Sequence, residues 1–306
     1  MTQTVFIDGA AGTTGLEIAE RLAGRGEFSL ILLDDARRKD AAARREALND
    51  ADFVILCLPD AAAVEAVSMI DNERTRVIDA STAFRVDPDW TYGFPELRAV
   101  QRDAIGASKR VSNPGCYPTG FLALVAPLVA AGIVERDARL RVNAVAGYSG
   151  GGKELIARFE ADQDIGFRSY GLNLAHKHIP EMRQHAGLAH APLFAPAVVP
   201  VYRGMLVEVP IAFERAVADA AFDALAAHFD GASLVSVRRA AGESELLLRK
   251  DDAATDRMEL MLYTDADAGQ LRLIARLDNL GKGASGACVQ NLNVMAGLPE
   301  TAGLRL

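Results

Sequence analysis

The sequence has 306 residues, half of them hydrophobic, and a formal net charge of −8. This length allows one large domain or two of ordinary size, each with a substantial core. The negative charge argues against a general nucleic-acid-binding protein, which needs a basic face to neutralise phosphates, so we expect no nucleic-acid partner.

Three widely spaced cysteines, Cys57, Cys116 and Cys288, show no metal-ligand spacing and leave one thiol over in any disulfide scheme. We therefore expect reduced thiols in a cytoplasmic protein. The N-terminal MTQTVFIDGA lacks a basic segment followed by an apolar one, which predicts a first strand and not a signal peptide. The most apolar run, residues 121–134, contains Pro127 and is too short to cross a bilayer, so we expect no membrane role.

The first predicted strand, residues 4–9 (TVFIDG), is followed by a glycine-rich turn and then by a helical segment that ends in ERLAGRG. The residues of the turn expected to contact a cofactor are Gly9, Gly12, Thr13, Thr14 and Gly15. Between a strand and a helix, glycines in this GxxGxxG spacing let backbone amides approach a pyrophosphate. Because the spacing differs from GxGxxG by one residue, an ordinary glycine-rich turn is the alternative.

Strand-like and helical segments alternate along the first third of the chain. Strands are expected at residues 28–34, 52–59 and 75–82, and helices at residues 38–50 and 60–72. Such alternation implies a parallel, doubly wound sheet. Together with the glycine turn, it predicts a nucleotide-binding Rossmann domain over residues 1–115.

The end of the second strand bears on the choice between NAD and NADP. An acidic residue there usually binds the ribose hydroxyls of NAD, whereas a nearby arginine accommodates the additional phosphate of NADP. Asp34 and Asp35 are followed by Arg37, Arg38 and Lys39, so the two signals conflict. A solvated helix start would also explain the cations. We expect NADP(H), because three cations near one turn would outweigh two acids.

Cys116 lies in SNPGCYPTG, directly after Pro114 and Gly115 and before the long apolar run. This position predicts a thiol in the first turn of a helix, where backbone amides and the helix dipole favour thiolate over thiol. Cys57, in an apolar strand, and Cys288, in a small-residue helical stretch, are expected to be packing residues. A packing role is also the alternative for Cys116.

A thiolate nucleophile needs a partner that handles protons, and HKHIPEM supplies His176 and His178. The other histidines, His185, His190 and His228, lie in alanine-rich or amphipathic surroundings that are typical of exposed or structural histidines. Two histidines at i and i+2 also suggest a metal, but no carboxylate or cysteine completes a recognisable ligand set, so we expect none.

Four segments together carry a resemblance to a known family: GAAGTTG, SNPGCYPTG, HKHIPEM and DNLGKGASGACVQNLNVM. They look like the N-acetyl-γ-glutamyl-phosphate reductases of the semialdehyde dehydrogenase superfamily, in their shorter variant. The likeness runs nearly from end to end and includes DASTAFRV and YGFPEL. The cysteine and C-terminal segments are specific to that family, whereas the glycine turn is not.

The resemblance implies NADPH-dependent reductive dephosphorylation of N-acetyl-γ-glutamyl phosphate to N-acetylglutamate 5-semialdehyde, a step of arginine biosynthesis. Cys116 would displace phosphate to form a thioester, which NADPH then reduces. By the family pattern, His178 is the acid/base group and Glu181 orients it. His176 is expected only to shape the segment.

Two arginines are candidates for the anionic groups of the substrate. Arg85 is expected to hold the acyl-phosphate oxygens bidentately, and a surface ion pair with Asp87 or Asp89 is the alternative. Phe84 beside it stands where many relatives carry a histidine, which weakens the transfer of detail but not of reaction type. Arg203, in PVYRGMLVEVP, is expected to bind a substrate carboxylate.

Two further segments are expected to lie at the cofactor and substrate. Residues 147–153 (GYSGGGK) should form a flexible loop whose Ser149 and Gly150 amide make contacts, with a structural turn as the alternative. Asn291, on the last helix, would contact the nicotinamide end of the cofactor. Its alternative role is that of an ordinary exposed polar residue.

The second half of the chain predicts a largely antiparallel sheet that carries helices. Strands are expected at residues 139–149, 195–213, 258–264 and 270–278, and a helix at residues 214–229. The fold class is therefore α/β, with a Rossmann domain (1–115), an α+β catalytic and dimerisation domain (116–280) and a C-terminal helix (281–306) returning to the Rossmann domain. The resemblance implies a homodimer or homotetramer.

Three alternative functions stay open. The same chemistry would also suit aspartyl phosphate or a carrier-linked aminoadipyl or glutamyl phosphate. A phosphorylating aldehyde dehydrogenase that works mainly in the oxidative direction is the second. The third, a non-catalytic nucleotide-binding protein, is disfavoured because it predicts loss of Cys116 or His178, and both are present.

Overall fold

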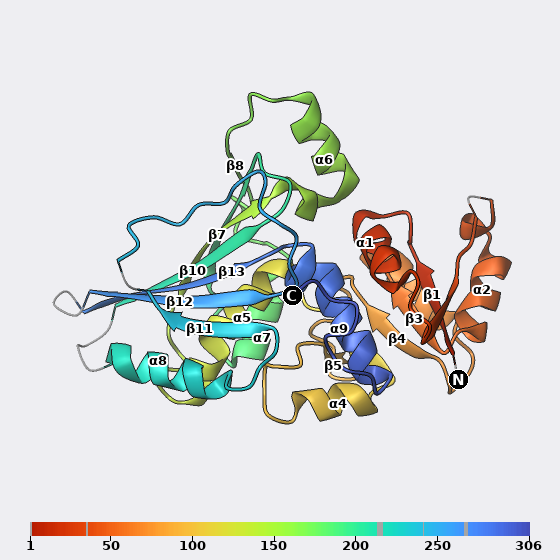
Figure 1. The fold of residues 1–306 in the computed structure, drawn as a ribbon, viewed down its shortest axis with the longest axis horizontal. Coiled ribbons are helices and arrows are strands. Elements are labelled where there is room, and N and C mark those ends of the chain that lie inside the picture. Colours follow the sequence, from red (N-terminus) through yellow and green to blue (C-terminus); the bar gives the residue numbers. More distant parts are fainter. Residues whose placement is uncertain (1, 35, 213–216, 241, 266–268) are drawn as a thin grey trace. The chain divides into compact units, whose positions relative to one another are not determined.

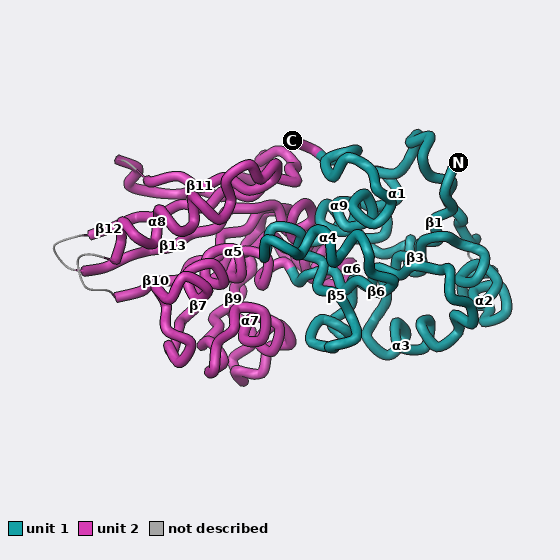
Figure 2. The backbone as a smooth tube through the Cα atoms, turned by 90° about the horizontal axis from the view of Figure 1, so that it is seen from below, with its two compact units in different colours: residues 1–115, 284–304 teal, residues 116–283, 305–306 magenta. Residues whose placement is uncertain are grey.

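The computed structural model describes residues 2–34, 36–212, 217–240, 242–265 and 269–306. The backbone divides into two compact units, which are coloured separately in Figure 2. Unit 1 comprises residues 1–115 and 284–304, and unit 2 comprises residues 116–283 and 305–306. Asp35 of the predicted acidic pair, and residues 213–216 of a predicted strand and helix, lie outside the described residues.

Unit 1 is built around a parallel six-stranded sheet with the order β2-β1-β3-β4-β6-β5 (Figure 1). Its strands are β1 (Gln3–Asp8), β2 (Phe28–Ile31), β3 (Phe53–Leu56), β4 (Arg76–Asp79), β5 (Thr91–Tyr92) and β6 (Arg110–Ser112). Its helices are α1 (Thr13–Leu22), η1 (Arg37–Lys39), α2 (Ala41–Asp50), α3 (Asp60–Ser68), α4 (Gln101–Ala107) and α9 (Gly286–Met295). The predicted doubly wound sheet is confirmed.

Successive residues of β1 pack into two separate hydrophobic clusters, because neighbouring side chains of a strand point to opposite faces. Val5 and Ile7 belong to the cluster that includes residues of α1 and α9. Phe6 belongs to the cluster that includes residues of α2 and α3. The sheet is therefore covered on both faces, which explains why its strands are continuous apolar runs in the sequence.

The C-terminal helix α9 belongs to unit 1, although it follows unit 2 in the sequence. It packs against α1, α4 and β4, and its Cys288, Val289 and Leu292 lie in the same cluster as Val5 and Ile7. The expected return of this helix to the Rossmann fold is confirmed.

Unit 2 contains a seven-stranded mixed sheet with the order β11-β12-β13-β10-β7-β9-β8. Its strands are β7 (Arg141–Gly147), β8 (Arg168–Ser169), β9 (Leu193–Val199), β10 (Met205–Ala212), β11 (Val235–Arg239), β12 (Met258–Asp265) and β13 (Gln270–Leu277). Its helices are α5 (Cys116–Ala130), η2 (Tyr148–Gly151), α6 (Gly152–Ala161), α7 (Ile179–Ala186) and α8 (Val217–His228). The pairs β7–β9 and β11–β12 are parallel, and the other neighbours are antiparallel.

Helix α5 packs closely against the sheet of unit 2, and most of its residues are buried, as its apolar sequence predicts. Gly120 permits this approach, since a Cβ at that position would lie 2.8 Å from Cγ2 of Val207 and 3.3 Å from Cβ of Ala275. Val207 lies on β10 and Ala275 on β13. Helix α5 also packs against α7, the helix that follows His178.

Residues 147–153 form the structural turn that was the alternative to a flexible loop. Tyr148–Gly151 form a turn of 3₁₀ helix, and α6 begins at Gly152. Gly152 has a φ of +72°, a conformation that glycine adopts at little steric cost, so the tight turn leads directly into the helix. None of the described helices is both long and apolar enough to cross a membrane.

Candidate active site

Cys116 is the first residue of α5, as the sequence predicts. Its side chain is partly exposed, at the end of the helix where backbone amides and the dipole favour a thiolate. Gly283 packs against it, because a Cβ at position 283 would lie 3.0 Å from Cβ of Cys116 and 3.1 Å from the carbonyl oxygen of Asp278. The segment that begins at Asp278 therefore limits where the thiol can lie.

The other two cysteines lie in the core of unit 1. Cys288 is fully buried, and Cys57 packs against the same hydrophobic cluster. Burial raises the pKa of Cys57 to about 12, and the nearby Asp79 and Asp8 raise it further. Burial also raises the pKa of Cys288 well above its ordinary value. Both remain thiols at neutral pH, and their predicted packing role is confirmed.

His178 directly precedes α7 and is 7% exposed. Its ring centroid lies 6.0 Å from that of Tyr117, the residue that follows the thiol in α5. The Tyr117 hydroxyl donates to the carbonyl oxygen of Ala197 in β9 at 3.1 Å. The Tyr170 hydroxyl in turn donates to the Tyr117 hydroxyl at 3.4 Å. The structure thus places the predicted acid/base group beside the first turn of α5.

Glu181, the predicted partner of His178, lies in the first turn of α7 and is 1% exposed. The amide of Met182 in the same turn donates to the carbonyl oxygen of His178 at 3.0 Å. An acidic side chain in the first turn is also favoured by the helix dipole. Sequence and structure therefore place Glu181 on the element that carries His178.

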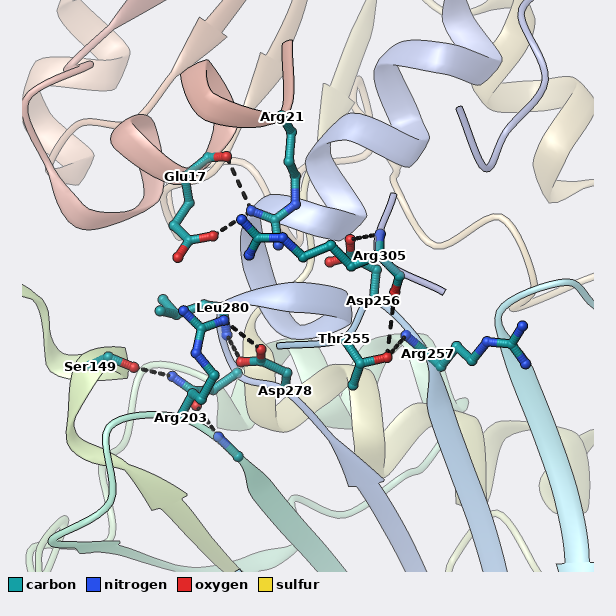
Figure 3. A network of polar contacts seen from close by, with 12 residues as sticks. Glu17, Arg21, Ser149, Arg203, Thr255, Asp256, Arg257, Asp278, Leu280 and Arg305 are labelled. Atoms are coloured by element: carbon teal, nitrogen blue, oxygen red, sulfur yellow. Dashed lines mark hydrogen bonds and ion pairs between the residues drawn. The ribbon is translucent and has the colours of Figure 1, made fainter. Parts of the chain in front are cut away.

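Arg203 is paired with a buried carboxylate in unit 2 (Figure 3). Its Nη1 donates to Oδ2 of Asp278 at 2.9 Å, and Oδ1 of the same carboxylate accepts the amide of Leu280 at 2.8 Å. A pocket of about 290 Å³ lies beside this pair, and Arg257 and Arg276 are among its other lining residues. Arg203 therefore faces a space that a small ligand would fill.

Ser149 is hydrogen-bonded to Asn279, the residue after Asp278. Nδ2 of Asn279 donates to Oγ of Ser149 at 2.9 Å, and Oδ1 of Asn279 accepts the amide of Gly204 at 3.0 Å. A Cβ at Gly150 would lie 3.3 Å from that Nδ2. We did not predict roles for Asp278 or Asn279, although both lie in the DNLGKG segment that carries the family resemblance.

The glycine turn of unit 1 lies where the strand order reverses, between the carboxyl ends of β1 and β3. Gly9 has a φ of +88°, and a Cβ there would lie 2.3 Å from the carbonyl oxygen of Cys57. A Cβ at Gly15 would lie 2.6 Å from the carbonyl oxygen of Gly9. Gly12 precedes α1 and has no side chain to cap the helix. The first backbone amides of α1 therefore remain available to bind the oxygens of a pyrophosphate.

Asp8, at the end of β1, forms an ion pair that the sequence does not reveal. Nε and Nη2 of Arg44, on α2, donate to its Oδ2 at 3.1 and 2.9 Å. The side chains of Arg44 and Asp8 are only 13% and 6% exposed. This pairing compensates a carboxylate that would otherwise repel a phosphate bound at the adjoining glycine turn.

Asp34 and Arg37, which follow β2, each form polar contacts of their own. Oδ1 of Asp34 accepts the amides of Ala36 and Arg37 at 3.1 and 2.8 Å. Nη2 of Arg37 donates to Oε2 of Glu46 at 3.0 Å on the exposed surface, and Arg38 is exposed as well. Asp34 thus caps its own turn, while two guanidinium groups lie after the second strand.

Asn291 is fully buried on α9, so the alternative that it is an exposed polar residue is wrong. Its Nδ2 donates to the carbonyl oxygen of Gly93 at 2.8 Å and to Oδ1 of Asn113 at 3.0 Å. Its Oδ1 is buried and accepts no hydrogen bond from any described residue. Since an orphaned buried acceptor is costly, this atom suits an amide donor on a bound group.

Arg85 is 8% exposed and belongs to a buried network in unit 1. Its Nε donates to the carbonyl oxygen of Asn113, and its Nη2 donates to that of Ala80, both at 2.9 Å. Asn113 in turn donates through Nδ2 to the carbonyl oxygen of Ala284 at 3.1 Å. Arg85 is therefore not the surface residue that the alternative reading required.

Two family models match the chain. The semialdehyde dehydrogenase NAD binding domain matches residues 4–106, and the semialdehyde dehydrogenase dimerisation domain matches residues 116–279. Among the described residues, no cluster of three or more histidine, cysteine, aspartate or glutamate side chains is arranged to hold a metal ion.

Curated relatives share nearly the whole chain. N-acetyl-gamma-glutamyl-phosphate reductase of Trichormus variabilis is 46% identical over 98% of both chains. The protein of the same name from Allorhizobium ampelinum is 48% identical over 96% of this chain and 99% of its own. In fold, the chain is similar to aspartate semialdehyde dehydrogenase II of Vibrio cholerae, with a TM-score of 0.71 and 15% identity over 97% of this chain and 99% of the other.

Proposed function

Since the chain belongs to the semialdehyde dehydrogenase family of oxidoreductases, we propose that it reduces N-acetyl-γ-glutamyl phosphate to N-acetylglutamate 5-semialdehyde with NADPH. This reaction is a step of arginine biosynthesis. The observation that supports it most directly is the position of Cys116 as the first residue of α5. The ring of the next residue, Tyr117, lies 6.0 Å from the ring of His178, measured between centroids. The near-complete overlap with relatives of that name supports the choice of acyl group.

The Cys116 thiolate attacks the carbonyl carbon of the acyl phosphate, the bond from carbon to the phosphate oxygen breaks, and a thioester remains. Bound NADPH supplies the hydride that reduces the thioester. His178 donates a proton to the former carbonyl oxygen, which gives the thiohemiacetal hydroxyl. As the carbon–sulfur bond breaks, His178 takes a proton back from that oxygen, and Cys116 leaves as thiolate. Glu181 orients His178.

Three residues hold the substrate in this proposal. Arg85 binds the phosphate oxygens, because a guanidinium fork matches them bidentately. Arg203 binds the substrate carboxylate, and its pairing with Asp278 sets the direction of the guanidinium beside the pocket. Ser149 donates its hydroxyl hydrogen to the substrate, since the Asn279 amide already donates to its oxygen.

The residues of unit 1 fit a nicotinamide dinucleotide. The glycine turn Gly9–Gly15, with Thr13 and Thr14 at the start of α1, binds the pyrophosphate through backbone amides. Arg37 and Arg38 bind the 2′-phosphate, so the cofactor is NADP(H). The orphaned Oδ1 of Asn291 accepts a hydrogen bond from the nicotinamide carboxamide, and the amide of Gly150 also contacts the cofactor.

Each of the three parts of the chain has its own role in this proposal. Residues 1–115 bind NADP(H), residues 116–280 carry catalysis and dimerisation, and residues 281–306 complete the cofactor-binding fold. The match of residues 116–279 to a dimerisation domain supports a homo-oligomer, and we propose a homodimer or a homotetramer in the cytoplasm.

The test is the reverse reaction of the purified enzyme. With N-acetylglutamate semialdehyde and phosphate, the wild type should reduce NADP⁺ faster than NAD⁺, and Cys116→Ser should lose at least about a hundredfold in rate. Phosphate-dependent activity with aspartate semialdehyde alone would retain the chemistry and replace the substrate. Activity that survives in Cys116→Ser would reject the thioester.

A further inference from the structure

The two histidines of HKHIPEM are joined by a hydrogen bond to the backbone. Nδ1 of His176 accepts the backbone N–H of His178 at 3.1 Å. The carbonyl oxygen of His176 accepts the amide of Ile179, the first residue of α7, at 3.0 Å. His176 therefore binds the two amides at which the chain enters α7, and one of them belongs to the candidate acid/base residue.

This geometry requires one protonation state of His176. Only a ring that carries its proton on Nε2 has a lone pair on Nδ1 to accept an N–H, and a protonated imidazolium has none. Burial lowers the pKa of His176 to about 4, and the charge of Lys177 lowers it further. The ring is consequently neutral at physiological pH and keeps the acceptor that the hydrogen bond needs.

Aromatic side chains from separate elements fix the His176 ring. Its centroid lies 5.1 Å from that of Phe194 on β9, with the two planes at 90°. Tyr170, which follows β8, lies 5.5 Å away, and Tyr117 on α5 lies 6.3 Å away. The ring of His178 lies 4.8 Å away on its own segment. A ring held on several sides offers its Nδ1 at a constant position.

The charged and titratable groups around His176 do not disturb this arrangement near neutral pH. Burial raises the pKa of Tyr117 well above its ordinary value and that of Tyr170 to about 12, so both stay neutral. The guanidinium carbon of Arg168 on β8 lies 4.5 Å from the centroid of the Tyr170 ring. The positive charge of Lys177 also disfavours a second proton on His176.

We propose that His176 is a positioning residue, whose Nδ1 holds the backbone of His178 and thereby sets where the acid/base imidazole lies. This inference rests on the function proposed above, because it gives His178 the proton transfer. In this proposal His176 does more than shape the segment. Its Nδ1 acceptor, and not only the bulk of its ring, is required to hold His178 in position.

Two substitutions separate the acceptor from the ring. His176→Asn places a side-chain oxygen close to the position of Nδ1 and removes the ring, whereas His176→Phe keeps the aromatic contacts and removes the acceptor. We expect the Phe variant to lose about tenfold or more in kcat with KM changed by less than about twofold. The Asn variant should recover kcat to within about threefold of the wild type. Circular dichroism establishes that each variant is folded.

The inference is overturned if the Phe variant retains wild-type kcat, or if the Asn variant loses as much activity as the Phe variant. A second measurement does not depend on activity. In protein labelled with ¹⁵N-histidine, NMR should show His176 protonated on Nε2 and not on Nδ1 at neutral pH, with the signal assigned from its absence in the variants. A proton on Nδ1 would reject the hydrogen bond, and hence the inference.

The same experiments separate this inference from the proposed function. If the wild type does not act on N-acetylglutamate semialdehyde, or if His178→Gln remains fully active, the proposed function fails on those results. The ¹⁵N spectra then still decide whether His176 holds the amide of His178. If His178→Gln is inactive and His176→Phe is fully active, the function stands and the positioning role is rejected.

Discussion

Asp79 is a buried carboxyl group in unit 1 whose replacement should change the stability of the protein in a pH-dependent way. It ends β4, is fully buried, and Oδ2 accepts the hydroxyl of Ser81 at 2.7 Å. Its Oδ1 has no hydrogen-bond partner among the described residues. Burial raises the pKa of Asp79 from 3.8 to about 6. Asp79→Asn keeps the shape and an acceptor for Ser81 but never carries a charge.

The sign of the effect follows from the direction of the pKa shift. Because the folded state binds this proton more tightly, the proton contributes stability that is fully present below pH 3.8 and is lost as the pH rises through about 6. A difference of about 2 in pKa corresponds to about 3 kcal/mol, at about 1.4 kcal/mol for each unit. The free energy of unfolding of Asp79→Asn, relative to the wild type, should therefore rise by about 2 kcal/mol between about pH 4.5 and about pH 7.5, because part of the full effect already falls below pH 4.5.

The only tryptophan, Trp90, provides the signal for this measurement, since it lies in the same unit and its ring stacks on Phe84 at 4.1 Å. Urea unfolding followed by its fluorescence gives the free energy at each pH for both proteins. Asp89→Asn, which changes an exposed carboxylate, serves as the control. A difference between Asp79→Asn and the wild type that stays constant across this range would refute the reasoning, because the other groups titrate alike in both.

Three further predictions concern the thiol and the cofactor turn. An alkylating reagent at neutral pH should label Cys116 in the folded enzyme and spare Cys57 and Cys288, whose raised pKa values keep them as thiols, and mass spectrometry of the digested protein would report the site. Gly283→Ala brings a Cβ to 3.0 Å from Cβ of Cys116, so we expect kcat to fall by about tenfold while NADP⁺ binding persists. An unchanged kcat would show that the thiol has room to move. Gly9→Ala combines a φ of +88° with a contact of 2.3 Å to the carbonyl oxygen of Cys57, and calorimetric titration should show NADP⁺ affinity reduced by at least about tenfold. Gly26→Ala, which meets nothing within 4 Å, should bind as the wild type does, and equal affinities for both variants would contradict the proposed turn.

Features that depend on short stretches of chain were predictable from the sequence. Proline and glycine before Cys116, and the apolar run after it, determine that the thiol begins a helix, because local backbone preferences decide where a helix starts. The alternation of strands and helices likewise predicted the parallel sheet of unit 1. The choice between a flexible loop and a structural turn at Tyr148–Gly151 stayed open, since glycines permit both, and only the structure shows the 3₁₀ turn.

The sequence by itself determined the fold class, the position of the candidate nucleophile at a helix start, its candidate histidine and the glycine turn after the first strand. Only the tertiary structure decided which distant residues complete these sites: Arg44 pairs with Asp8 across 36 positions, and Asn291 meets Asn113 across 178. Such pairs depend on which strands and helices become neighbours, and that order is set by packing of the whole core. No periodicity or motif near either residue carries this information, so the hydrogen bonds that orient the reacting groups appear only in the folded chain.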